Sequence, residues 1–335
     1  MGSADKRRLT SAMAILLRIV YHEPNPASIC DFAILLQRGI MRQMKFTLAL
    51  AQFAPRLGDV DSNLKRILDF VAQAQSQRAD LVIFPELALT GYYLKDLVPT
   101  VAARPMPHDP RFAPLIDASR NIDIVVGFVE EDARYRYYIS AAYLSAGHVM
   151  HVHRKTYLPT YRLFDDARFF APGNSFRAFN TRLGRMGMLI CEDAWHLSSP
   201  YVLWQDGADF LIDVSASPGY GSSTGDELAN AGTVKNFLQT YAALLTTFVF
   251  FSNRVGVEDG ITFWGGSGAL GPDGKPIATA PHFDEALTFA EIDTDALRRA
   301  RIELPTLRDE ESELVRHELG RVAKFELDRR TDKTL

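Results

Sequence analysis

From residue 44 onward, short apolar segments alternate with longer amphipathic ones, and this alternation limits the fold more than any other feature of the chain. Strands that alternate with helices pack as sheets whose outer faces are covered by helices. The expected strands are 46–53, 80–84, 123–129, 137–144, 148–153, 185–190, 208–214, 247–252, 267–270 and 286–292, and the expected helices are 61–77, 112–120, 195–205, 227–245, 294–301 and 309–325. No repeat and no low-complexity linker divides the chain. We therefore expect one α/β domain with two sheets and helices outside them.

Two turn signals predict how neighbouring strands connect. Ser-Ala-Gly at 145–147 separates two expected strands, as a hairpin turn does. Gly-Pro-Asp-Gly at 271–274 lies between the expected strands 267–270 and 286–292 and is a strong turn signal.

The composition narrows the classes of function. The net charge of −4 argues against nucleic-acid binding, which normally needs a basic patch. The chain has only two cysteines, Cys30 and Cys191, which are too few for a disulfide framework. We therefore expect a protein of the reducing cytoplasm.

The first 43 residues differ from the rest of the chain. They have a basic start and a short apolar run that Arg18 interrupts, and no signal-peptidase site follows closely. The run is much shorter than the roughly 20 residues that a membrane span needs. At Met44 the sequence changes to MKFTLALAQFAPRLGD, which predicts the first strand. We expect residues 1–43 to be a poorly ordered extension.

Three segments contain residues that could perform catalysis. Glu86 lies in LVIFPELALTGY, where the chain leaves a buried strand. Lys155 lies in HRKTYLPTYRLFDDARFFAPG, at the end of another strand. Active sites of α/β proteins form at such strand ends. Any one of these residues alone is a weak signal, because lone charged residues after strands are mostly solvated.

Cys191 lies in GMLICEDAWHLSSP, where an apolar strand stops and a helix is expected to begin. A helix N-terminus stabilises a thiolate, and we expect Asp193 to be the N-cap of that helix. Nearby, His151 and His153 share one strand face. They could be part of a metal site, but no third ligand stands near them, so we expect an ordinary half-exposed strand and no metal.

In this order the three segments resemble the nitrilase, or carbon–nitrogen hydrolase, superfamily. The matching stretches are FPELALTGY, HRKTYLP and GMLICED, and the resemblance runs from Met44 to about Val322. It implies a four-layer α-β-β-α sandwich over residues 44–335, with a helical arm from about residue 294. It also implies a homodimer or larger homo-oligomer, paired through outer helices and the C-terminal segment.

The resemblance implies a Glu–Lys–Cys triad that hydrolyses a small-molecule amide without a metal or organic cofactor. Cys191 attacks the carbonyl carbon and forms a thioester, and ammonia or an amine leaves. Glu86 transfers the protons, while Lys155 and a backbone N–H near Cys191 stabilise the oxyanion. Water activated by Glu86 then hydrolyses the thioester.

Within the superfamily the sequence resembles the glutaminase domain of glutamine-dependent NAD synthetases. The stretches that carry this resemblance are FPELALTGYYLKDL, KTYLPTYRLFDDARFFAPG, LICEDAW, SASP and NRVGVEDG. It implies a substrate pocket lined by Tyr92, Tyr161, Glu192 and Ser217, with Glu192 at the amino-acid end of the substrate. Asp166 stands where the family has a second glutamate, and it is one methylene shorter.

The sequence also departs from the synthetases. It ends at residue 335 without the SGGxDS-type loop of an ATP-pyrophosphatase domain, so we expect no synthetase domain in this chain. GSSTGDE at 221–227 lacks the Gly-Lys-Ser/Thr ending of a phosphate-binding loop, and we expect a mobile loop near the pocket instead.

Other functions stay open from the sequence. One is a Cys–His hydrolase that pairs Cys191 with one of the eight histidines, of which His196 is nearest in sequence, although we expect its helix to point it elsewhere. Others are an N-carbamoyl amine hydrolase, a nitrilase that acts on a C≡N bond, and a subunit that supplies ammonia to a separately encoded synthetase. A non-catalytic scaffold is the last, and the filled triad positions argue against it.

Overall fold

The computed structural model describes residues 44–220 and 228–332 of the 335-residue chain. The expected N-terminal extension, Cys30 and the segment 221–227 lie outside the described residues. Residues Met44–Leu335 form one compact unit, and the following description concerns that unit.

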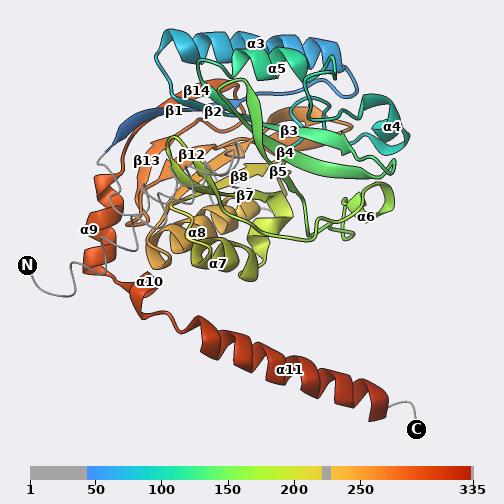
Figure 1. Ribbon diagram of the computed structural model, residues 1–335. Helices are drawn as coiled ribbons and strands as arrows, with labels where there is room; N and C mark the ends of the chain where they lie inside the picture. Colours follow the sequence, from blue (N-terminus) through green and yellow to red (C-terminus); the bar gives the residue numbers. More distant parts are fainter. Residues whose placement is uncertain (1–43, 221–227, 333–335) are drawn as a thin grey trace, which may run out of the picture. The chain divides into compact units, whose positions relative to one another are not determined.

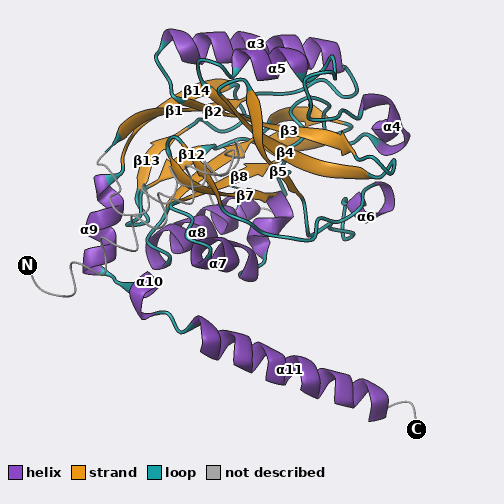
Figure 2. Cartoon of the chain, viewed as in Figure 1, coloured by secondary structure: helices purple, strands orange, loops and turns teal. Residues whose placement is uncertain are grey.

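Figures 1 and 2 show that strands and helices alternate along this unit. The strands are β1 (Lys45–Gln52), β2 (Leu81–Ile83), β3 (Asp123–Glu131), β4 (Tyr137–Ser145), β5 (His148–Arg154), β6 (Phe179–Thr181), β7 (Gly184–Ile190), β8 (Phe210–Ser215), β9 (Phe248–Asn253), β10 (Val255–Glu258), β11 (Ile261–Trp264), β12 (Gly268–Leu270), β13 (Pro276–Thr279) and β14 (Ala286–Asp293). The helices are α3 (Val60–Ser76), η1 (Lys95–Leu97), α4 (Val98–Val101), α5 (Ala113–Ala118), α6 (Asp166–Phe169), η2 (Cys191–Trp195), α7 (Ser198–Gln205), α8 (Ala229–Leu244), α9 (Asp295–Glu303), α10 (Thr306–Asp309) and α11 (Ser312–Asp332).

The strands form two six-stranded sheets and a separate hairpin of β10 and β11. The first sheet has the order β14-β1-β2-β3-β4-β5 and the second the order β13-β12-β9-β8-β7-β6. The central strands of each sheet, β1–β3 and β7–β9, are parallel, and the outer strands are antiparallel. The carboxyl ends of parallel strands lie at the same edge of a sheet, and active sites of α/β proteins form at that edge. The segments that follow β2, β7 and β8 therefore lie where an active site is expected.

The two sheets stack face to face and helices cover both outer faces, which confirms the expected α-β-β-α sandwich (Figure 1). The β1 sequence shows how the layers arise, because successive side chains of a strand point to opposite faces. Leu48 and Leu50 enter the core between the sheets, whereas Ala49 and Ala51 face the core beneath α3 and α5. The small alanines let these helices approach the sheet closely. The α7 and α8 helices cover the second sheet in the same way.

The sequence prediction was wrong about the strand that follows the turn at 271–274. That turn joins β12 to β13, an antiparallel strand at the edge of the second sheet. The next strand, β14, pairs with β1 in the first sheet, from Ala286 opposite Gln52 to Asp293 opposite Lys45. β13 escaped prediction because it is four residues long, begins with Pro276 and is largely exposed. Proline is tolerated at the first residue of an edge strand, although it weakens the strand signal.

The C-terminal helices differ from one another in burial. The α9 helix is attached to the sandwich through Leu297, which is fully buried. By contrast, the described side chains of α11 are exposed apart from the partly buried Val315 and Glu318, and the helix presents Leu314, Leu319 and Val322 to the surface. Over the described part of the chain, no helix combines the length and the apolar character that crossing a membrane requires.

Candidate active site

Glu86 lies in the turn that follows β2, and the fold buries it completely. Its side chain is 0% exposed, and its Oε2 accepts the backbone N–H of Ala216 at 2.8 Å. The turn packs directly against β3 at Gly127. A Cβ at that position would lie 2.8 Å from the Cα of Glu86, so glycine is the residue that lets the turn approach.

Lys155 immediately follows β5 and is also buried. Its Nζ donates to Glu86 Oε1 at 2.8 Å and to Asp166 Oδ2 at 2.8 Å. The other carboxylate oxygen of Asp166 accepts the Tyr92 hydroxyl at 2.7 Å. The shorter aspartate therefore reaches the lysine. The structure brings four of the predicted site residues into one hydrogen-bonded cluster, which we call the lysine cluster: Glu86, Lys155, Asp166 and Tyr92.

Burial and the neighbouring charges set the protonation of this cluster. Burial lowers the pKa of Lys155, but the carboxylates of Asp166 and Glu86 outweigh it and raise that pKa well above its usual value. Burial raises the pKa of Glu86, and the Lys155 cation opposes this rise. An ammonium held by two buried carboxylates is thus fixed as a cation, which suits it to stabilise a developing negative charge.

Cys191 stands at the junction of β7 and η2 in a strained conformation. Its φ of 49° lies in the left-handed region, which residues other than glycine rarely adopt. Burial raises the pKa of its thiol well above the usual value, Glu86 raises it further, and Lys155 opposes both. The sequence argument that a helix start would favour a thiolate is therefore outweighed, and the resting group is a thiol that needs a base.

Asp193 is not the N-cap that the sequence predicted. Ile190 occupies that position, and the regular helix α7 begins only at Ser198, after the separate turn η2. Asp193 Oδ1 accepts the backbone N–H groups of Thr156 and Tyr157, at 2.9 and 3.0 Å, and its Oδ2 accepts that of Ile190 at 3.1 Å. A single buried carboxylate thus ties the chain after Lys155 to the turn of the cysteine.

The histidines have structural partners. His153 is buried rather than half-exposed, and its Nε2 lies 2.8 Å from Asp193 Oδ2. His151 stacks on the ring of Phe179. His196, the candidate for a Cys–His pair, stacks on Tyr157 with a centroid distance of 3.5 Å. Its ring is therefore engaged by tyrosine on one face.

The predicted substrate contacts differ in how the structure places them. Tyr161 is 45% exposed, and its hydroxyl donates to Glu192 Oε2 at 3.0 Å. Tyr92 is buried in the lysine cluster. Ser217 is also buried, its N–H donates to Asn253 Oδ1 at 2.9 Å, and its hydroxyl accepts Trp264 Nε1 at 3.1 Å. The structure gives Ser217 a place in the packing, and its contact with substrate stays a prediction.

Two buried residues that support the cluster were missed from the sequence. Glu258 Oε1 accepts the backbone N–H groups of Tyr92 and Tyr93 at 2.8 and 2.7 Å. Arg254 Nη1 donates to the other oxygen of Glu258 at 2.7 Å. Both lie in the stretch NRVGVEDG, which the resemblance included, but no local pattern connects it with a loop 166 positions earlier.

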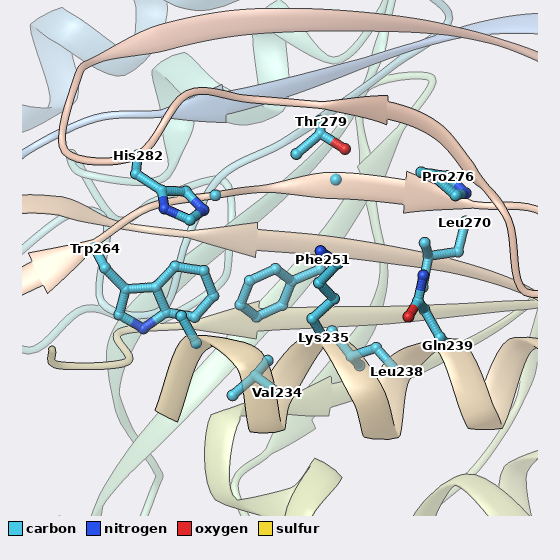
Figure 3. A pocket seen from close by; sticks show the side chains of 13 residues that line it. Val234, Lys235, Leu238, Gln239, Phe251, Trp264, Leu270, Pro276, Thr279 and His282 are labelled. Carbon is cyan, nitrogen blue, oxygen red and sulfur yellow. The ribbon is translucent and has the colours of Figure 1, made fainter. Parts of the chain in front are cut away.

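A groove of about 490 Å³ opens between α8 and the strands β12 and β13 (Figure 3). In this view Val234 and Leu238 of α8 face Phe251 of β9 and Trp264 at the end of β11. None of the predicted site residues lines the groove, so it is separate from the lysine cluster.

The sequence matches a known protein family over most of its length. The family model "carbon-nitrogen hydrolase" matches residues 47–302, which include Glu86, Lys155 and Cys191. The glutamine-dependent NAD(+) synthetase of Acinetobacter baylyi is 33% identical over 263 residues, covering 77% of this chain and 46% of the synthetase. The N-carbamoylputrescine amidase of Arabidopsis thaliana is 27% identical over 291 residues, covering 82% of this chain and 95% of the amidase.

The fold of the chain is similar to part of a solved synthetase structure. The glutamine-dependent NAD+ synthetase of Acinetobacter baumannii matches with a TM-score of 0.67 and 33% identity, over 76% of this chain and 47% of that one. The chain therefore spans about half the length of the synthetases that it matches.

Proposed function

The chain belongs to the carbon–nitrogen hydrolase family and is a hydrolase of carbon–nitrogen bonds, and we propose that it releases ammonia from a glutamine-like amide through a thioester on Cys191. The observation that carries the proposal is the buried contact of Lys155 with both Glu86 and Asp166. Amide hydrolysis needs a nucleophile, a proton carrier and a stabiliser of the oxyanion. The cluster and the neighbouring cysteine supply one group for each task.

The first half-reaction begins with a neutral thiol, because burial raises the pKa of Cys191. Glu86 takes the thiol proton as the sulfur attacks the carbonyl carbon, and then donates that proton to the leaving nitrogen. The C–N bond breaks, ammonia leaves and a thioester remains. In the second half-reaction Glu86 removes a proton from water, and the oxygen of that water attacks the thioester carbonyl carbon. The C–S bond then breaks, the carboxylic acid product leaves, and Glu86 returns the proton to the sulfur, which restores the thiol.

Lys155 and one backbone N–H are the proposed donors to the oxyanion. An ammonium group has three N–H donors, and Glu86 and Asp166 take two of those of Lys155, which leaves one for the substrate. The N–H of Cys191 itself donates to Asp213 Oδ1. The following N–H, that of Glu192, belongs to the first turn of a 3₁₀ helix, where N–H groups have no partner inside the helix.

Glu192 is the proposed contact for the substrate's ammonium group. Its side chain is only 11% exposed, and among the described residues its ion-pair partner is His196, at 3.9 Å. A largely buried carboxylate with so long an ion-pair contact is poorly compensated and favours a bound cation. The hydroxyl of Tyr161 orients this carboxylate.

A substrate panel tests this assignment. With L-glutamine, an N-carbamoyl amine, a simple amide and a nitrile compared by ammonia release, we expect L-glutamine to be the best substrate. Glu192→Gln should raise the KM for L-glutamine about 10- to 100-fold, because a hydrogen bond to a charged group is lost, while kcat changes less. A neutral amide that lacks the ammonium group is the control, and its KM should change far less. An equal change for both amides would contradict the role of Glu192.

N-Carbamoyl amine hydrolysis is the second candidate. The match to the carbamoylputrescine amidase covers 95% of that protein, whereas the match to the synthetase covers 46% of that one. A carbamoyl amine also carries an amide nitrogen that Glu86 can protonate. Faster ammonia release from the carbamoyl amine than from L-glutamine would favour this function, with Cys191 still the nucleophile but the intermediate a thiocarbamate on its sulfur.

We also propose that the protein acts as a homodimer or larger homo-oligomer, and that a separate synthetase is a candidate recipient of its ammonia. The α11 helix supports the first point. Leu319 and Val322 lie three positions apart on one face of it, and both are exposed. Exposed apolar faces favour protein contacts. Sedimentation of the full chain at micromolar concentration should show a dimer or larger species, and a single monomeric species would contradict this proposal.

A further inference from the structure

Asp213 is a buried carboxyl group on β8, directly behind the turn of the nucleophile, and the reaction proposed above does not use it. Its side chain is 1% exposed. Its Oδ1 accepts the backbone N–H of Cys191 at 3.1 Å and the hydroxyl of Ser215 at 3.1 Å. We propose that Asp213 is a positioning residue that holds Cys191 through this N–H and weakens the nucleophile when its own proton is lost. The inference rests on the proposed function only in taking Cys191 as the nucleophile.

The positioning role follows from the backbone around Cys191. The parallel ladder between β7 and β8 ends with Ile190 opposite Val214, so Cys191 lies just beyond the last regular pair. Its left-handed φ of 49° turns the chain out of the strand. A buried N–H at such a turn needs an acceptor, and the side chain of Asp213 provides it from the neighbouring strand. Without this acceptor the strained conformation would lose its main polar support.

The charge role follows from the groups that face Asp213. These are Cys191 and Asp193 from the turn after β7, Glu86 from the turn after β2, and Tyr241 from α8. The two acids among them, Glu86 and Asp193, raise the pKa of Asp213, although Lys155 and His153 contact these acids at 2.8 Å. Ionisation of Asp213 would add another buried negative charge beside these acids. The protonated, neutral form of Asp213 is therefore favoured.

The pKa values agree with this arrangement. Burial raises the pKa of Asp213 to about 8, and the charges of Glu86 and Asp193 contribute to the rise. Below that pH the carboxyl of Asp213 is neutral, so it does not disfavour loss of the proton from the Cys191 thiol. Above it the anion raises the pKa of Cys191 further, beyond the effects of burial and Glu86. Activity should therefore fall as pH rises through about 8.

Two substitutions at Asp213 separate the two roles. Asp213→Asn keeps an amide oxygen for the N–H of Cys191 but cannot ionise, so the fall in kcat above about pH 8 should disappear. Asp213→Ala removes the acceptor and should lower kcat at every pH, about 10- to 100-fold, because it leaves a buried donor unpaired. A wild-type kcat in Asp213→Ala would overturn the positioning role. An unchanged alkaline fall in Asp213→Asn would overturn the charge role.

A second readout needs no substrate and so separates this inference from the proposed function. Iodoacetamide labels the thiolate, and mass spectrometry of the Cys191 peptide gives the rate of labelling at each pH. At about pH 9, above the pKa of Asp213, labelling should be faster in Asp213→Asn than in wild type, because thiolate formation no longer meets the second anion. Equal rates would overturn the inference even in a protein that hydrolyses L-glutamine. Faster labelling in a protein that hydrolyses no amide would support it while the proposed function fails.

Ser215→Ala keeps the test decisive if substitution of Asp213 prevents folding. The hydrogen bond from Ser215 lowers the pKa of Asp213, so removing it should move the alkaline fall in activity and the change in labelling to higher pH. This variant leaves Asp213 and Cys191 in place. A pH profile that does not move would contradict the assignment of the alkaline fall to Asp213.

Discussion

Replacement of Cys191 by alanine is expected to abolish amide hydrolysis while leaving the fold intact. No neighbouring group can form the acyl intermediate in its place, because Glu86 and Lys155 are engaged with each other at 2.8 Å. Losses after removal of a catalytic nucleophile are on the order of 10⁴-fold or more. Ammonia release from L-glutamine measures turnover, and circular dichroism with thermal unfolding verifies the fold.

Two further variants sharpen this prediction. Cys191→Ser keeps the shape of the side chain but offers a far less acidic group, so it should also be severely impaired. Cys30→Ser is the matched control, because it removes the other cysteine of the chain, and it should keep full activity. Substantial turnover in Cys191→Ala would contradict the assignment of the nucleophile.

The second large effect is expected at Glu86. Glu86→Gln keeps the size of the side chain and an acceptor for the N–H of Ala216, but it cannot take the thiol proton. General base catalysis contributes about 10²–10⁴-fold, and kcat should fall by that amount. In wild type, burial raises the pKa of Glu86, so activity should fall with decreasing pH at a higher pH than for a solvated glutamate. This acid limb should vanish in the variant.

Asp123→Asn provides a matched control for Glu86→Gln. Asp123 is also a buried carboxylate, and it accepts the hydroxyls of Tyr143 and Ser145 at 2.7 and 2.6 Å. It lies at the start of β3, whereas Glu86 lies beyond the end of β2. Loss of a buried charge there should affect stability and leave the pH profile of kcat unchanged. Equal losses of kcat in both variants would indicate that Glu86 is only structural.

Local patterns in the sequence predicted an α/β domain with two sheets and outer helices, whereas the four-layer sandwich and the joining of Glu86, Lys155 and Cys191 in one site were implied by the resemblance to the carbon–nitrogen hydrolase superfamily. Apolar runs marked the strands, and Glu86, Lys155 and Cys191 each follow one of them. Parallel strands bring their carboxyl ends together, so residues far apart in the sequence were expected at one edge. The resemblance supplied Asp166, and the structure shows that its shorter side chain still contacts the lysine.

The supporting residues escaped prediction because their partners are distant in the sequence. Asp193 was expected to cap a helix, and instead it accepts N–H groups from the chain after Lys155. Asp213 and Glu258 carry no local signal, since an acidic residue in a strand or turn is usually solvated. Their function appears only when the strands are paired and the acceptors meet the backbone of Cys191 and Tyr92.

The central claim is that hydrolysis passes through a thioester on Cys191, and trapping the adduct tests it most directly. The full-length enzyme is mixed briefly with a slowly hydrolysed amide, quenched in acid and digested, and the peptides are analysed by mass spectrometry. We predict that the mass of the acyl group appears on the peptide that contains Cys191, and that it disappears in Cys191→Ala. An adduct found only on the peptide of Cys30, or turnover in Cys191→Ala, would contradict the account.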